Sequence, residues 1–129
     1  MRVYNKWHLM IKQELKKMNL THPQFVVLAS LAYLSQNGNE VTQIMISKLS
    51  GIDVMTVSQI LGLLEKHNFV KRKEHSRDTR AKAVTLNKKG EEILQKAVPL
   101  IEQIDEFFFG KLDNDEEQFK HFLVSLNEE

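Results

Sequence analysis

The hydrophobic positions of this chain follow two different patterns. Through most of the sequence they recur every three or four residues, as on one face of a helix, whereas residues 69–86 form two short strand-like runs around a polar turn. The first helix is predicted over residues 4–18, with an apolar face formed by Tyr4, Trp7, Ile11, Leu15 and Met18. The pattern predicts a mainly α-helical (α+β) fold with one small β-hairpin.

The second predicted helix has a well-marked start. The Thr21 hydroxyl can cap it while Gln24, three residues later, bonds back to the cap, and Leu20 can pack on Phe25. Pro23 is tolerated in a first helical turn, where its missing N–H would be unpaired anyway. We expect this helix to end near Gln36, before an Asn-Gly pair.

Two shorter helices follow, separated by a glycine turn. After an extended piece at residues 40–42, Thr42 caps a helix that runs to about residue 50, with Ile46 and Leu49 facing inward. Gly51 ends it, because glycine accepts the left-handed conformation. Asp53 caps the next helix, whose predicted buried face comprises Val54, Val57, Leu61 and Leu64.

The opposite face of this helix is short, polar and nearly uncharged. It carries Met55, Thr56, Ser58, Gln59 and Gly62. Side chains of this kind let a helix approach base edges closely in the DNA major groove. An ordinary surface helix is the alternative interpretation.

A basic hairpin comes next. The helix ends near His67-Asn68, where asparagine tolerates the left-handed conformation, and Phe69 begins a strand. The turn at residues 76–79 contains Arg77 and is followed by Arg80. In the returning strand Val84 and Leu86 point one way while Lys82 and Thr85 largely point the other. The order helix, turn, helix, basic hairpin is typical of a winged helix-turn-helix, which places one helix in the major groove and a charged loop beside it.

The C-terminal third is predicted to form two more helices. Asn87 caps a long helix with apolar positions Ile93, Ala97, Ile101, Ile104 and Phe108. Pro99 lies within it and predicts a kink, Gly110 ends it, and a last helix covers about residues 114–126. Phe107-Phe108-Phe109 covers too wide an arc for one face packed on its own lobe, which favours a two-fold dimer over a triple-phenylalanine corner within one chain.

Charge divides the chain into unlike parts. The overall net charge is +1, yet residues 53–90 have net charge +5 and residues 91–129 have net charge −8. The basic part would attract phosphates and the acidic part would be repelled by them. Solvated surface charge is the alternative, but the basic residues fall on the predicted hairpin, which favours nucleic acid.

Composition excludes several classes of protein. The chain has no cysteine, so disulfides and thiolate metal sites are absent, and its five histidines are scattered without the spacing of metal ligands. We find no long apolar run and no signal peptide, and expect a cytoplasmic protein without membrane association. Phosphate-binding glycine loops, the H-E-x-x-H motif and nucleophile elbows are also absent, which disfavours an enzyme with a cofactor.

Residues 20–90 resemble the MarR family of bacterial transcriptional regulators. The most specific match is Asp78-x-Arg80 followed by Leu86 and Gly90, at the spacing of that family's wing motif. Asp53-x-x-Thr56-Val57-Ser58-x-x-Leu61-x-x-Leu64 resembles its recognition helix, and Leu20-Thr21-x-x-Gln24-Phe25-x-x-Leu28 resembles the start of its second helix. Asn87 and Asn68 stand where threonine and glycine are usual, and both replacements suit the same local conformations.

The resemblance implies a single domain over residues 1–129 that forms a homodimer. Residues of about 37–90 would form the winged helix-turn-helix lobe that binds double-stranded DNA, and residues 1–20 and 91–129 would form the dimerisation helices. Such a dimer reads a pseudo-palindromic operator, and the expected function is that of a repressor.

The resemblance also suggests which residues contact DNA. We assign base contacts to Met55, Thr56, Ser58 and Gln59, and phosphate contacts to Thr42, Gln43, Lys71 and Lys73. Arg80 and Arg77 would enter the minor groove, where narrow A·T-rich segments attract arginine. Asp78 is interpreted as a stabilising strut for the wing, paired with Arg72 or Arg80.

A small aromatic or phenolic effector is the remaining implication of the resemblance. Its pocket would lie between the DNA-binding lobe and the dimer helices, with Trp7, Met10, Ile11 and Tyr33 as candidate lining residues. At helical spacing such residues are more often core, and a regulator without an effector fits the sequence equally well. The rival function is a winged helix that binds a protein partner and no specific DNA.

Overall fold

The computed structural model describes residues 2–74 and 82–109. This part of the chain contains five helices and three short strands, in agreement with the predicted winged helix-turn-helix. The elements are α1 (Arg2–Lys16), α2 (His22–Ser35), β1 (Val41–Thr42), α3 (Gln43–Ser50), α4 (Val54–Lys66), β2 (Val70–Glu74), β3 (Lys82–Leu86) and α5 (Lys88–Phe109).

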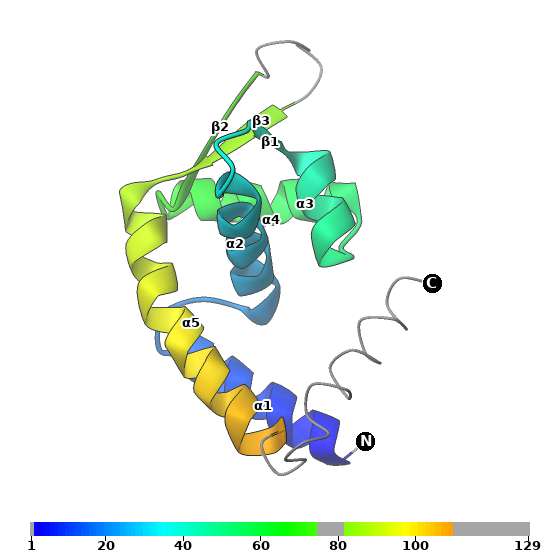
Figure 1. The fold of residues 1–129 in the computed structure, drawn as a ribbon, viewed down its shortest axis with the longest axis vertical. Helices are drawn as coiled ribbons and strands as arrows, with labels where there is room; N and C mark the ends of the chain where they lie inside the picture. Colours follow the sequence, from blue (N-terminus) through cyan, green and yellow to red (C-terminus); the bar gives the residue numbers. More distant parts are fainter. Residues whose placement is uncertain (1, 75–81, 110–129) are drawn as a thin grey trace.

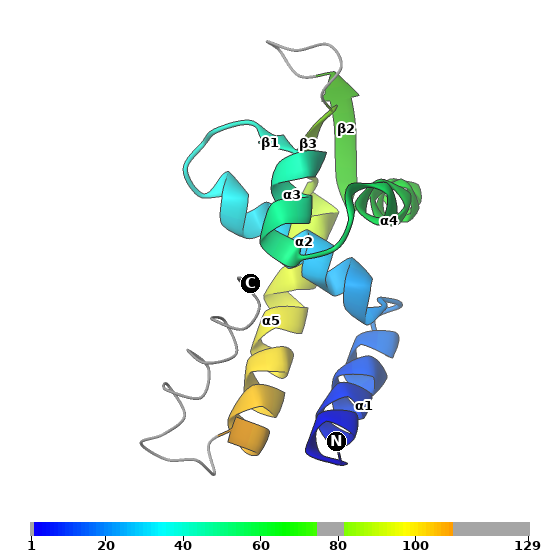
Figure 2. The ribbon, with the colours of Figure 1, turned by 90° about the vertical axis from the view of Figure 1, so that its right-hand side faces the viewer.

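The molecule has two parts (Figure 1). The first, which we call the lobe, comprises α2, α3, α4 and the three strands; the second, which we call the arm, comprises α1 and the distal half of α5. Figure 2 shows α1 and α5 side by side as they descend from the lobe. One buried core runs through both parts and includes Ile11 and Leu15 of α1, Leu28 of α2 and Leu61 of α4.

Short-range caps explain where the lobe helices begin. Thr21 and Gln24 form the predicted capping box, with the Gln24 N–H donating to Thr21 Oγ1 at 3.2 Å and the Thr21 N–H donating to Gln24 Oε1 at 3.1 Å. Thr42 caps α3 and Asp53 caps α4, as predicted. Gly51 ends α3 at φ 77°, a left-handed conformation that suits glycine.

Two aliphatic side chains are more exposed than predicted. Leu49 and Val54 were expected to face inward but are 44% and 41% exposed. Ile46 is the residue of the eight-residue α3 that is buried, so the buried face of this helix is narrow and does not include Leu49. Val54 is the first residue of α4. Ile46, Val57, Leu61 and Leu64 are fully buried, as predicted.

The extended piece at residues 40–42 becomes part of a sheet. β1 pairs antiparallel with β3, which in turn pairs with β2, so the strand order is β1-β3-β2. The sequence indicated the hairpin of β2 and β3 but not this third strand, because a two-residue strand has no period of its own. The pairing ties the start of α3 to the wing.

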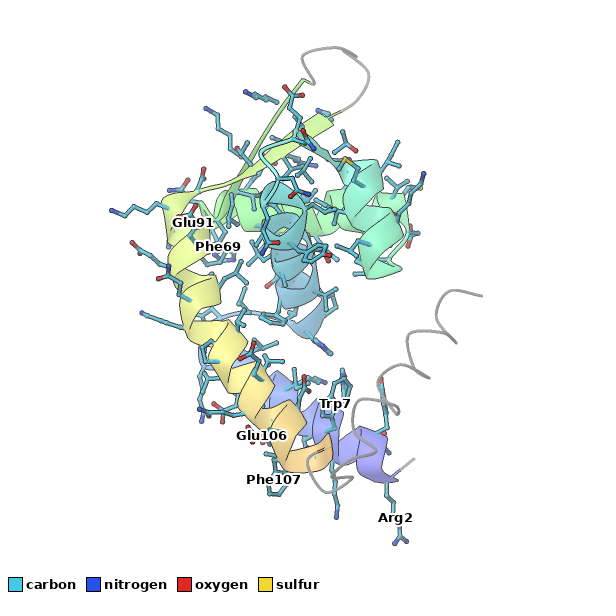
Figure 3. All side chains as sticks on the ribbon, viewed as in Figure 1. Arg2, Trp7, Phe69, Glu91, Glu106 and Phe107 are labelled. Carbon is cyan, nitrogen blue, oxygen red and sulfur yellow. The ribbon has the colours of Figure 1, made fainter. Side chains whose placement is uncertain are left out.

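A close backbone contact joins the wing to α5. Asn68 adopts φ 62°, as predicted, and the Asn87 side-chain amide donates to Asn68 Oδ1 at 3.0 Å and to its carbonyl at 3.3 Å. A Cβ added at Gly90 would lie 2.3 Å from the Phe69 carbonyl oxygen. Glycine at position 90 therefore lets α5 approach the root of β2 (Figure 3).

The long helix α5 is continuous through Pro99 as far as Phe109. Its buried face comprises Leu94, Ala97 and Ile104, of which Leu94 was not predicted. The predicted turn at residues 76–79, the end of this helix at Gly110 and the last helix at about 114–126 lie outside the described residues.

Candidate nucleic-acid interface

The helix-turn-helix is made by α3 and α4, which are bent by 111° across the turn between them. An angle in this range is typical of helix-turn-helix units, in which the second helix is presented to the major groove. Among the described residues, no single helix is long and apolar enough to cross a membrane; α3 and α4 pass that test of length and composition only as this bent pair.

The polar face of α4 is accessible. Met55 is 73% exposed, Gln59 is exposed, and Thr56 and Ser58 are half-buried. The Thr56 hydroxyl donates to Asp53 Oδ1 at 2.5 Å, so its proton is used within the helix cap and its methyl group is the part left for an apolar contact. This side-chain bond, together with the Thr56 backbone N–H, lowers the pKa of the Asp53 carboxyl.

Arg72 of β2 lies at the centre of a polar cluster with Gln43, Ser58 and Glu65. Its Nη2 lies 2.6 Å from Glu65 Oε1 and its Nε donates to the same oxygen at 2.8 Å. Its Nη1 donates to Gln43 Oε1 at 2.9 Å and to both the carbonyl and the Oγ of Ser58 at 3.2 Å. This Arg72 cluster joins the first strand of the wing to both helices of the helix-turn-helix.

Strand register separates the basic residues of β2. Arg72 is opposite Val84, whereas Lys71 and Lys73 are opposite Thr85 and Ala83. Because successive side chains of a strand point to opposite faces, Lys71 and Lys73 lie on the face away from Arg72. Both lysines are exposed, so their charges are available to solvent or to phosphate.

A second feature lies between the arm and the lobe. A cavity of about 810 Å³ is bordered by α1, the first turn of α2 and the turn between α3 and α4. Its wall combines apolar residues such as Leu9, Leu20 and Ile52 with the basic or titratable residues His8, Lys12, Lys16 and His22.

Two histidines face one another on this wall. His22 Nδ1 lies 3.3 Å from His8 Nδ1, so one of the two nitrogens must carry the proton that joins them. Burial and then the neighbouring His8 lower the pKa of His22, with Asp105 opposing them. Asp105 accepts a hydrogen bond from Trp7 Nε1 at 2.7 Å, and the Trp7 ring packs edge-on to His22.

Comparison with known proteins decides the family. The model of the ArnR1-like winged-helix domain matches residues 16–104. The HTH-type transcriptional regulator YdcH of Bacillus subtilis is 34% identical over 122 residues, which cover 95% of this chain and 80% of YdcH. The chain is a MarR-family winged-helix transcriptional regulator. The resemblance noted from residues 20–90 is thereby confirmed.

Solved structures agree with this assignment. Bordetella bronchiseptica BpsR, whose DNA binding is regulated by 6-hydroxynicotinic acid, is 27% identical with a TM-score of 0.81; the match covers 96% of this chain and 86% of BpsR. S. aureus MepR, solved as a DNA complex, gives a TM-score of 0.84 at 24% identity, over 97% of this chain and 90% of MepR, and shows the fold alone. The relation to an HTH-type regulator and the match to a winged-helix domain make the chain a DNA-binding transcriptional regulator.

The residues predicted to contact DNA differ in their exposure and in their hydrogen bonds within the protein. Met55, Gln59, Lys71 and Lys73 are exposed. The Thr42 hydroxyl oxygen instead accepts a hydrogen bond from the Met45 N–H, and the Gln43 amide oxygen accepts one from Arg72. Arg77, Asp78 and Arg80 lie outside the described residues. Arg72, one of the two arginines predicted to pair with Asp78, makes an ion pair with Glu65 of α4; the prediction for Asp78 itself concerns residues outside the described part of the chain.

The predicted effector residues do not line the cavity. Ile11 is fully buried core, Met10 packs against that core, Trp7 bonds to Asp105, and Tyr33 is 62% exposed near the far end of α2. Apolar spacing selects the core face of α1, whereas the cavity is bordered by its neighbouring, more polar face. Sequence reasoning therefore missed Lys12 and Lys16 as residues that border the cavity. It also missed Glu65 as the ion-pair partner of Arg72, for which a lone acid near a helix end was the only signal.

Proposed function

We propose that the regulator is a cytoplasmic repressor that binds a pseudo-palindromic operator as a homodimer. In this proposal it binds DNA and does not catalyse a reaction. The observation that carries this proposal is the exposed, uncharged face of α4 beside a strand with exposed lysines. A helix with short polar side chains can enter the major groove, and flanking cations can bind phosphate. The structure of MepR with DNA, and the shared fold, support the same docking.

Each part of the interface has a distinct proposed role. Met55, the Thr56 methyl, Ser58 and Gln59 contact bases, with Gln59 suited to adenine and an apolar contact suited to the thymine methyl. Thr42, Gln43, Lys71 and Lys73 contact phosphates, which set register rather than sequence. Arg77 and Arg80 contact the minor groove, and Asp78 stabilises the wing.

The homodimer is proposed from the arm. Tyr4 and Leu9 of α1 and Phe107 of α5 are large apolar side chains, yet they are 54%, 53% and 57% exposed. A second copy is the commonest cover for such a surface, and two-fold symmetry then places two α4 helices for two half-sites.

Selection from a random duplex pool, followed by fluorescence anisotropy, tests the proposed function. The selected duplex and its scrambled version are titrated between about 50 and 200 mM salt. We expect a consensus with two related half-sites, preferred over the scrambled duplex, with an affinity that falls steeply as salt rises. Absence of a consensus, with weak and salt-insensitive binding, would favour a winged helix that serves a protein partner.

We further propose that a small aromatic acid or phenol occupies the cavity and alters DNA binding. The mixture of apolar wall and the cations Lys12 and Lys16 suits a flat anionic molecule, and BpsR responds to 6-hydroxynicotinic acid. Because Trp7 packs on His22 of the cavity wall, the fluorescence of this single tryptophan should change on binding.

Titration with 6-hydroxynicotinic acid as the probe tests the cavity. Lys12→Met should weaken binding about tenfold, as expected for one lost charged hydrogen bond. Lys17→Met is the matched control, since Lys17 lies outside the cavity and pairs with Glu14. Equal affinities of the two variants would remove the cavity from the proposal.

A further inference from the structure

We propose that Arg72 is a positioning residue for DNA reading, which fixes the hydrogen-bond direction of Gln43 and Ser58 and the spacing between the wing and α4. This inference rests on the proposed function, because it concerns how the same interface is organised. It differs from the expected role of Arg72 within the wing itself.

The chemistry of the guanidinium group determines the direction of these hydrogen bonds. Arginine has only donors, so the Gln43 atom that lies 2.9 Å from Nη1 is the amide oxygen. The Gln43 NH₂ group is then the part left to donate. In the same way, Ser58 Oγ accepts from Nη1 at 3.2 Å, which leaves the hydroxyl proton free to donate.

Hydrogen-bond donors with a fixed direction at Gln43 and Ser58 are complementary to the acceptors of DNA. Phosphate oxygens are acceptors, and so are N7 and O6 of guanine in the major groove. Without Arg72, the Gln43 amide could turn either way and the Ser58 hydroxyl could rotate. The cluster therefore gives the helix-turn-helix a preferred hydrogen-bond polarity before DNA arrives, which reduces the ordering cost of binding.

The geometry argues against Arg72 as a phosphate contact of its own. Its side chain is 19% exposed, and two of its nitrogens bond to the Glu65 carboxylate, which neutralises much of its charge. Its neighbour Lys71 points to the opposite face of the sheet and is exposed. Removal of the Lys71 charge and loss of the Arg72 fork should therefore have different signatures.

The test compares variants by the ratio of their affinities for the selected duplex and its scrambled version. Arg72→Lys keeps the positive charge but cannot bridge Gln43, Ser58 and Glu65 together. We expect it to lower the ratio about tenfold, within the range of one good base contact, and to leave the salt slope unchanged. Lys71→Met should weaken both affinities equally, reduce the salt slope by about 0.9 and keep the ratio.

A double-mutant cycle separates positioning from general stability. If Arg72 acts through Ser58, the ratio for Arg72→Lys with Ser58→Ala should fall no further than for the worse single variant. Simple additivity would overturn this route, as would an unchanged ratio for Arg72→Lys or an equal loss of ratio for Lys71→Met.

Thermal unfolding of each variant controls for loss of the fold. If Arg72→Lys does not fold, Glu65→Gln replaces it, because glutamine keeps an acceptor for Arg72 while removing the ion pair; we expect its ratio to fall about threefold, and an unchanged ratio would contradict the inference. Wild-type protein without any preference would instead refute the proposed function itself.

Discussion

The lobe and the arm of this regulator differ in how completely they bury their apolar side chains. Most of the buried core lies in the lobe, where α2, α3, α4 and the sheet cover one another and each helix has a capped start. The arm is two helices side by side, and it keeps Tyr4, Leu9 and Phe107 more than half exposed. The difference indicates that the lobe supplies most of the shared core, whereas the arm also has exposed apolar surface suited to another molecule.

Breaking the arm should have the largest effect. Phe107→Asp places a carboxylate in the proposed dimer interface, and we expect the dimer dissociation constant to rise at least about 100-fold, because an unpaired charge is costly to bury. Sedimentation across a concentration series measures it. Leu63→Asp is the control, since Leu63 of α4 is 45% exposed on the lobe and should leave dimerisation intact. A Phe107→Asp protein that remains dimeric at low concentration would move the interface elsewhere.

The joint between lobe and arm should be the next most sensitive place. Gly90→Ala drives a methyl group against the Phe69 carbonyl oxygen, and we expect a loss of about 3 kcal/mol in unfolding free energy. Gly62→Ala is the matched control, because its Cβ meets only Arg72 Nη2, at 3.6 Å, and alanine favours the helix. Urea unfolding distinguishes them, and equal stabilities would show that α5 can shift away from β2.

Loss of a cap in the lobe should cost less. Thr21→Ala removes the acceptor for the Gln24 N–H and should lower the unfolding free energy by about 1 kcal/mol, whereas Thr21→Ser should retain most of it. Both variants are compared with wild type by thermal unfolding. A Thr21→Ala protein as stable as wild type would show that packing of Leu20 on Phe25 alone defines the start of α2.

The smallest expected effect is a pH dependence at the boundary of the two parts. Because the folded state lowers the pKa of His22 below its ordinary value of 6.5, the unfolded chain takes up the proton first as pH falls. Stability should therefore decline below about pH 6.5, and above it His22 should contribute no slope. Unfolding of wild type and His22→Gln from about pH 7.5 to about pH 5.5 measures the difference. A stability gap that does not change with pH would contradict the burial of a neutral His22.

The lobe could be predicted from sequence in more detail than the arm. Caps at Thr21, Thr42 and Asp53, and the left-handed Gly51 and Asn68, are local signals that depend on a few neighbouring residues. The extended conformation at residues 40–42 was predicted, but its pairing as strand β1 was not, because that pairing is defined by the partner β3.

The DNA interface could be predicted only in part, because some of its contacts join residues that are far apart in the sequence. The exposed face of α4 follows from helical spacing, and Met55 and Gln59 lie where that spacing places them. The Arg72 cluster joins residues up to 29 positions apart, and the cavity joins α1 to the α3–α4 turn, so neither has a local pattern. Of the candidate pocket residues chosen by apolar spacing, Ile11 lies in the core and Tyr33 is exposed, and none of them borders the cavity.

Hydroxyl-radical footprinting of the selected operator tests the central claim most directly, because it needs the lobe to read DNA and the arm to join two lobes. The account predicts two protected patches on one face of the duplex, centred about one helical turn apart, with Phe107→Asp protecting them only at much higher concentration. A single protected patch that is unaffected by Phe107→Asp would show that one copy reads the operator alone and would contradict the account.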